Sequence, residues 1–288
     1  MRLLRCGIAV VVVGMAAGAL SLGCGGGGQV SHPPDDTRIL IVCKNPNLAD
    51  GADVRAKLLA TGFFFSVALF DATDPAILAP PSPGLAALNA SYDAVLVMGD
   101  GVFKDGDVLG NDLKGYVDAG NGLAIAMFCH RGQAAEPPNM PDGLGSTFDA
   151  ANYFAIPEVT TPPFDNQVGG SFGMNPGSVL AAHPILLGGG VLGAPAVVTG
   201  TWNGGTTCPR PNTTSASIVL GSTLVAEWSD GPAFSSTPLL VTRLVGPMTA
   251  RRADLGLYPA TVTTRPNGLP LASFQLIVNT MLWLCNKL

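Results

Sequence analysis

Blocks of aliphatic residues alternate with helix-forming segments along the first part of the chain. Continuous apolar runs are typical of parallel strands that helices cover on both faces. Such runs, with one less regular apolar segment, predict four strands, at 38–43, 63–70, 92–98 and 123–128. Helix formers and Gly-containing stops predict helices at 52–60 and around Leu113, Tyr116 and Val117. The order strand, helix, strand, strand, helix, strand therefore predicts an α/β fold: a mostly parallel sheet with helices on both faces.

Ligand sites in such folds lie beyond the carboxyl ends of the parallel strands. Three predicted loops begin there, at 44–50, 99–110 and 129–133. The candidate cleft-lining residues that these loops supply are Asn45, Asp100, Asp105 and Arg131. The aspartates of residues 100–112 lack the spacing and the closing Glu of an EF-hand. We therefore interpret this segment as a solvated acidic loop and predict no metal site.

The second half of the chain is less regular. Pro, Gly, Asn and Thr dominate residues 134–216, where only short helices or edge strands are expected. Order returns with two predicted strands, at 223–228 and 239–245. In the last predicted element, a helix, apolar residues repeat on one face, which directs Cys285 toward the core. We therefore predict a single α/β domain over residues 38–288.

The N-terminus has the proportions of an export signal. Two arginines precede an apolar run, residues 8–20, which is shorter than the roughly 20 apolar residues that span a bilayer. The end of this segment at Cys24, followed by four glycines, resembles the signal of bacterial lipoproteins. The resemblance implies that Cys24 becomes the lipidated first residue of the mature chain; the alternative is a plain secretory signal cleaved nearby. Residues 1–24 are thus the predicted signal peptide, and residues 25–37 a flexible Gly/Pro-rich tether.

Export changes how the cysteines are interpreted. The four that remain in the predicted domain are Cys43, Cys129, Cys208 and Cys285. An even number in an oxidising compartment favours disulfides, and three connectivities are open. No Cys or His spacing is typical of a zinc site, and no cofactor is predicted.

Charge excludes one class of partner. The 288 residues carry a formal net charge of −5, and the 15 Lys and Arg residues do not cluster. This distribution excludes a protein that follows the phosphates of a nucleic acid. Charged residues make up 12% of the chain and hydrophobic residues 47%, which is ample material for a buried core.

Five stretches carry a family resemblance. They are ILIV at 39–42, YDAVLVMGDG at 92–101, LKGYVDAGNGLAIAMF at 113–128, AHPIL at 182–186 and the terminal ASFQLIVNTMLWL. In this order they resemble the class I glutamine amidotransferase-like superfamily, and most closely its secreted members, including the trehalose-utilisation-protein-like branch. The resemblance implies a flavodoxin-like fold in which the segment around His183 is structural.

Catalytic members of that superfamily carry a Cys nucleophile just after the strand that matches 123–128, with a His as base. The resemblance places Cys129 at this position, and His130 follows it. Small residues normally flank such a nucleophile two positions to either side, whereas Met127 and Arg131 stand here. The late His-Xaa-Glu segment of the amidotransferases is also missing. These departures favour a domain without catalytic function.

We therefore expect an extracytoplasmic protein that is lipid-anchored to the cell envelope, in the periplasm or at the cell surface. We expect the lipid anchor to attach the protein to the membrane, and we expect the domain to bind a small molecule, an envelope glycan or a protein. The alternative is a cysteine hydrolase or amidase that uses Cys129 with His130. A third hypothesis, carbohydrate binding, rests on Trp202 and Trp228, whose rings could stack on a sugar.

Overall fold

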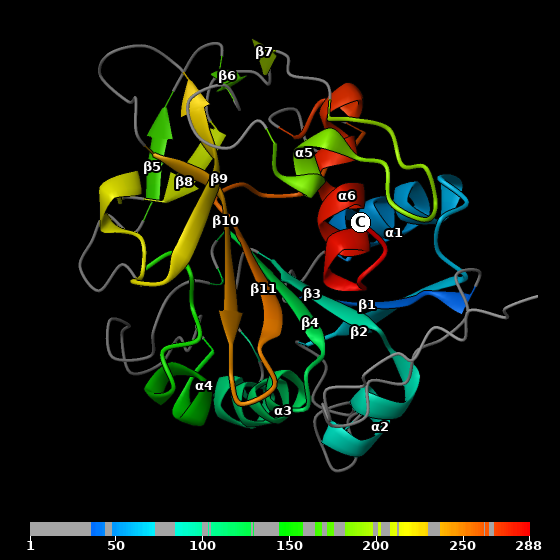
Figure 1. Ribbon diagram of the computed structural model, residues 1–288, viewed down its shortest axis with the longest axis vertical. Helices are drawn as coiled ribbons and strands as arrows, with labels where there is room; N and C mark the ends of the chain where they lie inside the picture. Colours follow the sequence, from blue (N-terminus) through cyan, green and yellow to red (C-terminus); the bar gives the residue numbers. More distant parts are fainter. Residues whose placement is uncertain are drawn as a thin grey trace, which may run out of the picture.

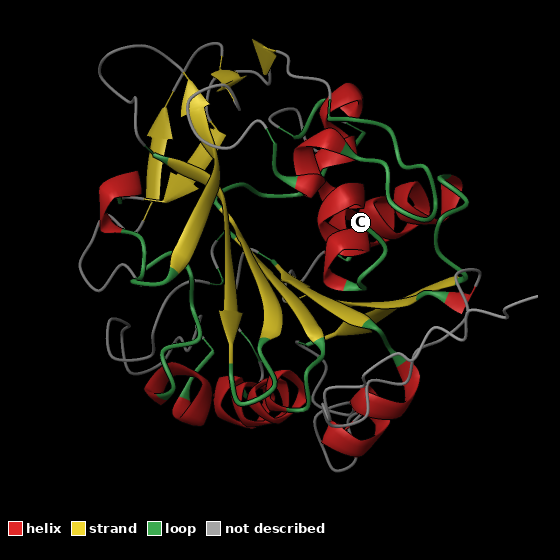
Figure 2. Ribbon diagram, viewed as in Figure 1, coloured by secondary structure: helices red, strands yellow, loops and turns green. Residues whose placement is uncertain are grey.

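A sheet with helices on both faces forms the body of the molecule (Figures 1 and 2). The computed structural model describes residues 36–43, 48–72, 84–99, 103, 105–127, 129, 144–157, 165–168, 172–175, 182–197, 201–202, 208–211, 213–229, 237–261, 263–264 and 268–288. Within this part of the chain, the nine strands of the sheet are, in spatial order, β2 (Ser66–Asp71), β1 (Arg38–Cys43), β3 (Ala94–Met98), β4 (Gly122–Ala126), β11 (Ala250–Leu255), β10 (Pro238–Val245), β9 (Ser222–Ser229), β6 (Phe172–Asn175) and β7 (Thr201–Trp202). A separate pair consists of β5 (Asp165–Val168) and β8 (Cys208–Pro211). The helices are α1 (Ala49–Ala60), α2 (Gly84–Ser91), α3 (Gly106–Asp118), α4 (Ser146–Ala150), α5 (Pro184–Leu187) and α6 (Gln275–Leu284), with short 3-10 turns η4 (Ser215–Ser217) and η5 (Leu271–Phe274).

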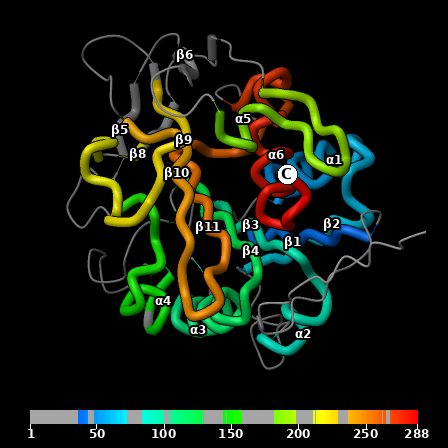
Figure 3. Tube along the Cα trace, viewed as in Figure 1, coloured from blue at the N-terminus to red at the C-terminus, as the bar shows by residue number. Residues whose placement is uncertain are grey.

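The sheet has a parallel half and an antiparallel half. The strands β2-β1-β3-β4-β11 all run in the same direction. The strands β10-β9-β6-β7 extend the sheet, each antiparallel to its neighbour. The two halves meet at β11, which comes from late in the sequence and lies beside β4 from much earlier (Figure 3). The α/β class is therefore confirmed.

The parallel strands define two ends of the sheet. We call the end at which β1, β3, β4 and β11 begin the amino edge, and the end at which they finish the carboxyl edge. Because β10 runs against β11, the hairpin between them lies at the amino edge, beside the end of α3 (Figure 1). The last turn of α6 lies there too: a Cβ on Gly122, the first residue of β4, would stand 2.6 Å from the Leu284 carbonyl oxygen.

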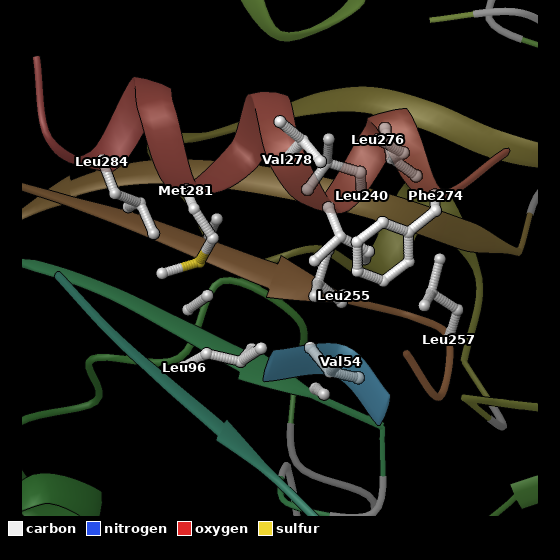
Figure 4. Packing of buried hydrophobic residues seen from close by; sticks show 14 of the residues in the cluster. Val54, Leu96, Leu240, Leu255, Leu257, Phe274, Leu276, Val278, Met281 and Leu284 are labelled. Atoms are coloured by element: carbon white, nitrogen blue, oxygen red, sulfur yellow. The ribbon is translucent and has the colours of Figure 1, made fainter. Parts of the chain in front are cut away.

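Alternate residues of the parallel strands face two separate apolar clusters. Ile39 and Ile41 of β1 belong to the cluster that α1, α5 and α6 cover. Leu40 and Val42 belong to the cluster that α2, α3 and α4 cover. Figure 4 shows the first cluster, in which apolar side chains of α6 lie over those of β10 and β11. Burial on both faces explains why these strands carry uninterrupted apolar runs.

Most predicted elements are confirmed within a few residues. They are β1, α1, β2, β3, α3, β4, β9, β10 and α6. The prediction that Cys285 points into the core is also confirmed, because the residue is 9% exposed. The sequence prediction omitted β11, although this strand joins the two halves of the sheet. Its sequence, ARRADL, is not an aliphatic run.

Two charged side chains of β11 form an ion pair inside the protein. Arg252 and Asp254 are both 0% exposed, and their side chains meet at 2.5 Å. The guanidinium also donates to the carbonyl oxygens of Tyr153, at 3.1 Å, and Leu123, at 2.9 Å. The Leu123 carbonyl belongs to the neighbouring strand β4, so the arginine links three segments of the chain. These partners replace the water that a buried guanidinium loses.

The carboxylate of Asp254 holds the segment that follows α4. Its Oδ2 accepts from the backbone N–H of Ala155, at 2.6 Å, and of Ile156, at 2.9 Å. These residues lie about one hundred positions away from Asp254 in the sequence. The pair therefore fastens a distant, irregular segment onto the central strand.

Replacing Asp254 by Asn should lower the free energy of unfolding by about 3–5 kcal/mol, because it leaves the buried guanidinium of Arg252 without a counter-charge. Urea unfolding measures the change. Asp107→Asn is the matched control: this carboxylate is exposed in the first turn of α3, and its removal should cost at most about 1 kcal/mol. Equal effects of the two substitutions would contradict the role assigned to the pair.

Candidate functional site

Four parallel strands bring their last residues together at the carboxyl edge. These residues are Cys43 of β1, Met98 of β3, Ala126 of β4 and Leu255 of β11. The chain beyond β4 stays close to the chain beyond β11, because the Met127 N–H donates to the Leu257 carbonyl at 3.1 Å. Parallel α/β sheets bind ligands at this edge, so it is the candidate site.

Cys129 lies in a tight turn directly after β4. Its N–H donates to the Ala126 carbonyl at 3.1 Å. Its thiol donates to the carbonyl of Gly99 at 3.9 Å, and the residue is 0% exposed. Gly99 has a φ of +143°, a backbone conformation that favours glycine. Cys129 thus follows β4 at the carboxyl edge, but its thiol faces the protein interior, in a cluster that includes Phe103 and Leu144.

The other candidate residues are distributed differently. Asp105 is the N-cap of α3: its side chain accepts from the Val108 N–H at 3.0 Å and is exposed. This contact stabilises the helix start and explains the residue without a ligand. The remaining predicted site residues lie outside the part of the chain that the structure describes: Cys24, Asn45, Asp100, His130 and Arg131.

The disulfide prediction is wrong for three of the four domain cysteines. Cys43, Cys129 and Cys285 are buried and none of them is in a disulfide. Cys43 and Cys129 belong to the clusters on opposite faces of the sheet. Cys285 follows α6 at the amino edge, whereas Cys43 ends β1 at the carboxyl edge. A disulfide requires Cα atoms within about 7 Å, and the placement of these residues on opposite faces or at opposite edges of the sheet explains why none of the three is in a disulfide. The side chain of Cys208, in β8, lies outside the description.

Buried thiols of this kind are poor nucleophiles. Burial raises the pKa of Cys285 well above its usual value, and the negative charge of Asp93 raises it further. The protonated thiol is the unreactive form. Cys43 is covered by α1, since a Cβ on Gly51 would stand 3.3 Å from its Sγ atom.

Two acidic residues of α1 close part of the carboxyl edge. The Tyr258 hydroxyl donates to Asp50 Oδ2 at 2.9 Å. The N–H and hydroxyl of Thr261 donate to Asp53 Oδ2 at 3.0 and 2.7 Å, and Lys57 lies 2.9 Å from the other oxygen of Asp53. The four residues joined by these hydrogen bonds, Asp50, Asp53, Tyr258 and Thr261, are each at most 8% exposed. They fasten the chain after β11 onto α1, so this side of the edge is sealed by polar contacts.

The sequence pattern does not single out these residues. The start of α1 otherwise carries small or apolar residues, and the two carboxylates there, Asp50 and Asp53, are three positions apart. This pair was the one sequence feature that could have pointed to the contact. Their partners, Tyr258 and Thr261, are more than 200 positions away, and no local pattern links them.

The described residues support neither sugar stacking by Trp228 nor a metal site. Trp228 is 2% exposed, and its indole N–H donates to the Gly256 carbonyl at 2.9 Å, so it is a core residue and not a sugar platform. The side chain of Trp202 is outside the description. Among the described residues, no three His, Cys, Asp or Glu side chains gather in a way that suits a metal ion.

Comparison with known proteins leaves the family open. No protein-family model and no curated protein sequence matches the chain. In the described part, no helix combines the length and apolar character needed to cross a bilayer. A functional assignment therefore depends on the residues and topology of the chain itself.

His183 has a structural contact. It is the N-cap of α5, and its Nδ1 atom accepts from the Ile185 N–H at 3.2 Å. Its ring lies 5.6 Å from the ring of Trp283. Burial lowers the pKa of His183, and the positive charge of Arg251 lowers it further. The neutral imidazole is thus the form that the fold stabilises, because a protonated Nδ1 cannot accept this hydrogen bond.

This contact predicts a pH dependence of stability. The unfolded chain protonates His183 near pH 6.5, whereas the folded chain does so only at lower pH. The free energy of unfolding should therefore fall as the pH drops below about 6.5, and the fall should end once the folded-state pKa is passed. Urea unfolding between pH 8 and pH 5 measures it. His183→Asn keeps an N-cap acceptor and should lose this part of the pH dependence; identical profiles for the two proteins would refute the assignment.

Proposed function

We propose that the chain is a lipid-anchored, extracytoplasmic binding protein whose amidotransferase-like domain has no catalytic cysteine. The observation that carries the non-catalytic part is the position of Cys129: the thiol after β4 is fully buried and donates to the Gly99 carbonyl. A nucleophile must meet its substrate and form a thiolate, and an apolar, closed environment opposes both. The binding role is assigned to the carboxyl edge.

The strand order supports the finer fold assignment. The parallel half follows the order β2-β1-β3-β4 and then the last parallel strand, β11, which is the order of flavodoxin-like folds. In that order, the switch point lies between β1 and β3, whose ends are Cys43 and Met98. We propose this position at the carboxyl edge as the place where a small molecule, an envelope glycan or a segment of a partner protein binds.

The alternative function, a cysteine hydrolase or amidase, is favoured by one observation. Cys129 follows the strand β4 at the carboxyl edge, where catalytic relatives of the resembled superfamily hold their nucleophile. Its proposed base, His130, lies outside the described residues. The reactivity of the thiol separates the two functions.

Alkylation of the native protein at neutral pH should leave Cys129 unlabelled, because the residue is buried. Intact mass and peptide mapping measure the labelling, before and after denaturation in urea. Val108→Cys, which places a thiol on the exposed face of α3, is the positive control and should label completely. One label on Cys129 in the native state, at the rate of this control, would overturn the binding proposal in favour of the hydrolase.

The anchor is tested by Cys24→Ser, which removes the residue to be lipidated. We expect the variant to move from the membrane fraction to the soluble fraction, while the wild-type chain stays with the membranes. Cys6→Ser is the matched control, since this cysteine lies within the predicted signal and should leave anchoring unchanged. A Cys24→Ser chain that remains in the membrane fraction would refute lipid anchoring.

A further inference from the structure

Exposed apolar side chains gather at the amino edge. Nine large hydrophobic residues are exposed in the described part of the chain. Five of them lie at or next to this edge: Leu59, Phe65, Val191, Leu220 and Leu244. Phe65 directly precedes β2 and is 63% exposed, and Leu220 lies two positions before the start of β9 and is 93% exposed. Single exposed apolar residues are ordinary, but a row of them along one end of a sheet is a candidate contact surface.

Backbone contacts place the members of this row. Phe65 donates its N–H to the Thr37 carbonyl, next to the start of β1. Val191 donates to the Lys287 carbonyl at 3.2 Å, beyond the end of α6. Leu244 pairs with Arg251 beside the β10–β11 hairpin. Leu220 lies just before β9, whose first residue pairs with Arg243 in the same part of the sheet.

The same edge carries most of the positive charge that the structure describes. Five basic side chains lie there: Arg38, Lys114, Arg243, Arg251 and Lys287. The described carboxylates near them are Asp36, Asp93, Asp118 and Asp149, of which Asp36 is paired with Arg38 and Asp118 with Lys114. Cations therefore outnumber carboxylates among these side chains.

The side chains that the structure describes at the carboxyl edge are mainly acidic. Exposed or half-buried acids at this edge and at the start of α3 are Asp71, Asp105, Asp107 and Glu227. An anionic bilayer attracts cationic groups close to its surface and repels carboxylates. The charges of the described residues thus favour one orientation of the fold on such a surface.

The position of the anchor favours the same orientation. Cys24 is separated from Asp36 by eleven residues, and a chain of that length reaches about 40 Å when fully extended. A fold of about 250 residues is about 45 Å across, from its expected radius of gyration. Asp36 and Arg38 lie at the amino edge, so the tether holds this edge, and not the opposite one, close to the lipid.

From these observations we propose that the amino edge rests on an anionic lipid surface, with Phe65 and Leu220 in the headgroup region and the candidate site facing away. This orientation rests on the proposed lipid anchor. Aromatic and aliphatic side chains beside cations are typical of surfaces that lie in the membrane interface.

The test compares two matched leucine positions. Leu220→Cys lies at the amino edge, and Leu271→Cys lies in η5, just before α6, at the carboxyl edge; both leucines are exposed. Each variant, carrying Cys208→Ser to leave a single accessible thiol, is purified in its natural lipidated form and labelled with a fluorophore. It is then reconstituted into vesicles of phosphatidylglycerol and phosphatidylcholine that contain spin-labelled lipid. Flotation measures attachment, and fluorescence quenching by the spin label measures the depth of each position.

We expect both variants to float and quenching at position 220 to be at least threefold stronger than at position 271. Replacing phosphatidylglycerol by phosphatidylcholine should reduce this ratio, because the attraction of the cations is lost. Flotation with equal quenching, or with stronger quenching at position 271, would overturn the orientation and leave the anchor intact. Failure of the wild-type lipidated chain to float would overturn the anchor and the orientation together.

Discussion

The fold depends on burying a charged strand in the middle of the sheet. β11 joins the parallel and antiparallel halves, and it can do so only because Arg252 and Asp254 neutralise each other without water. Carbonyls of β4 and of the segment after α4 complete the hydrogen bonding of the guanidinium, and two N–H groups of that segment complete the carboxylate. The pair thereby determines which distant segments of the chain meet. This role is better supported than a net contribution of the ion pair to the free energy of unfolding, because desolvation offsets the attraction of buried charges.

This dependence explains which elements could be predicted from the sequence. Runs such as those of β1, β3 and β4 are apolar because each strand is buried on both faces, so their pattern alone predicts them. Half of the residues in β11 are charged, and local pattern therefore points to the surface. The partners that make its burial possible come from positions 123 and 153–156, and a sequence shows no trace of such contacts until the fold is known.

The location of the candidate site could be predicted from the sequence, but the solvent exposure of its side chains could not. The breaks after the apolar runs located the carboxyl edge, and Cys129 lies there as expected. Whether a side chain at a strand end faces solvent depends on what covers it, and here Gly99 and Phe103 do so. Counting cysteines failed for a related reason, because an even number says nothing of the face or the edge on which each thiol lies. The hydrogen bond from Tyr258 to Asp50 could not be predicted either, because the two residues are far apart in the sequence.

Topology also relates attachment to binding. β1 is the first strand of the parallel half, so whatever precedes it in the chain must join the fold at the amino edge. The ends of all five parallel strands lie at the opposite edge by the same rule. A chain tethered through residues before Arg38 therefore presents its strand ends away from the point of attachment. This separation follows from the parallel direction of the strands alone.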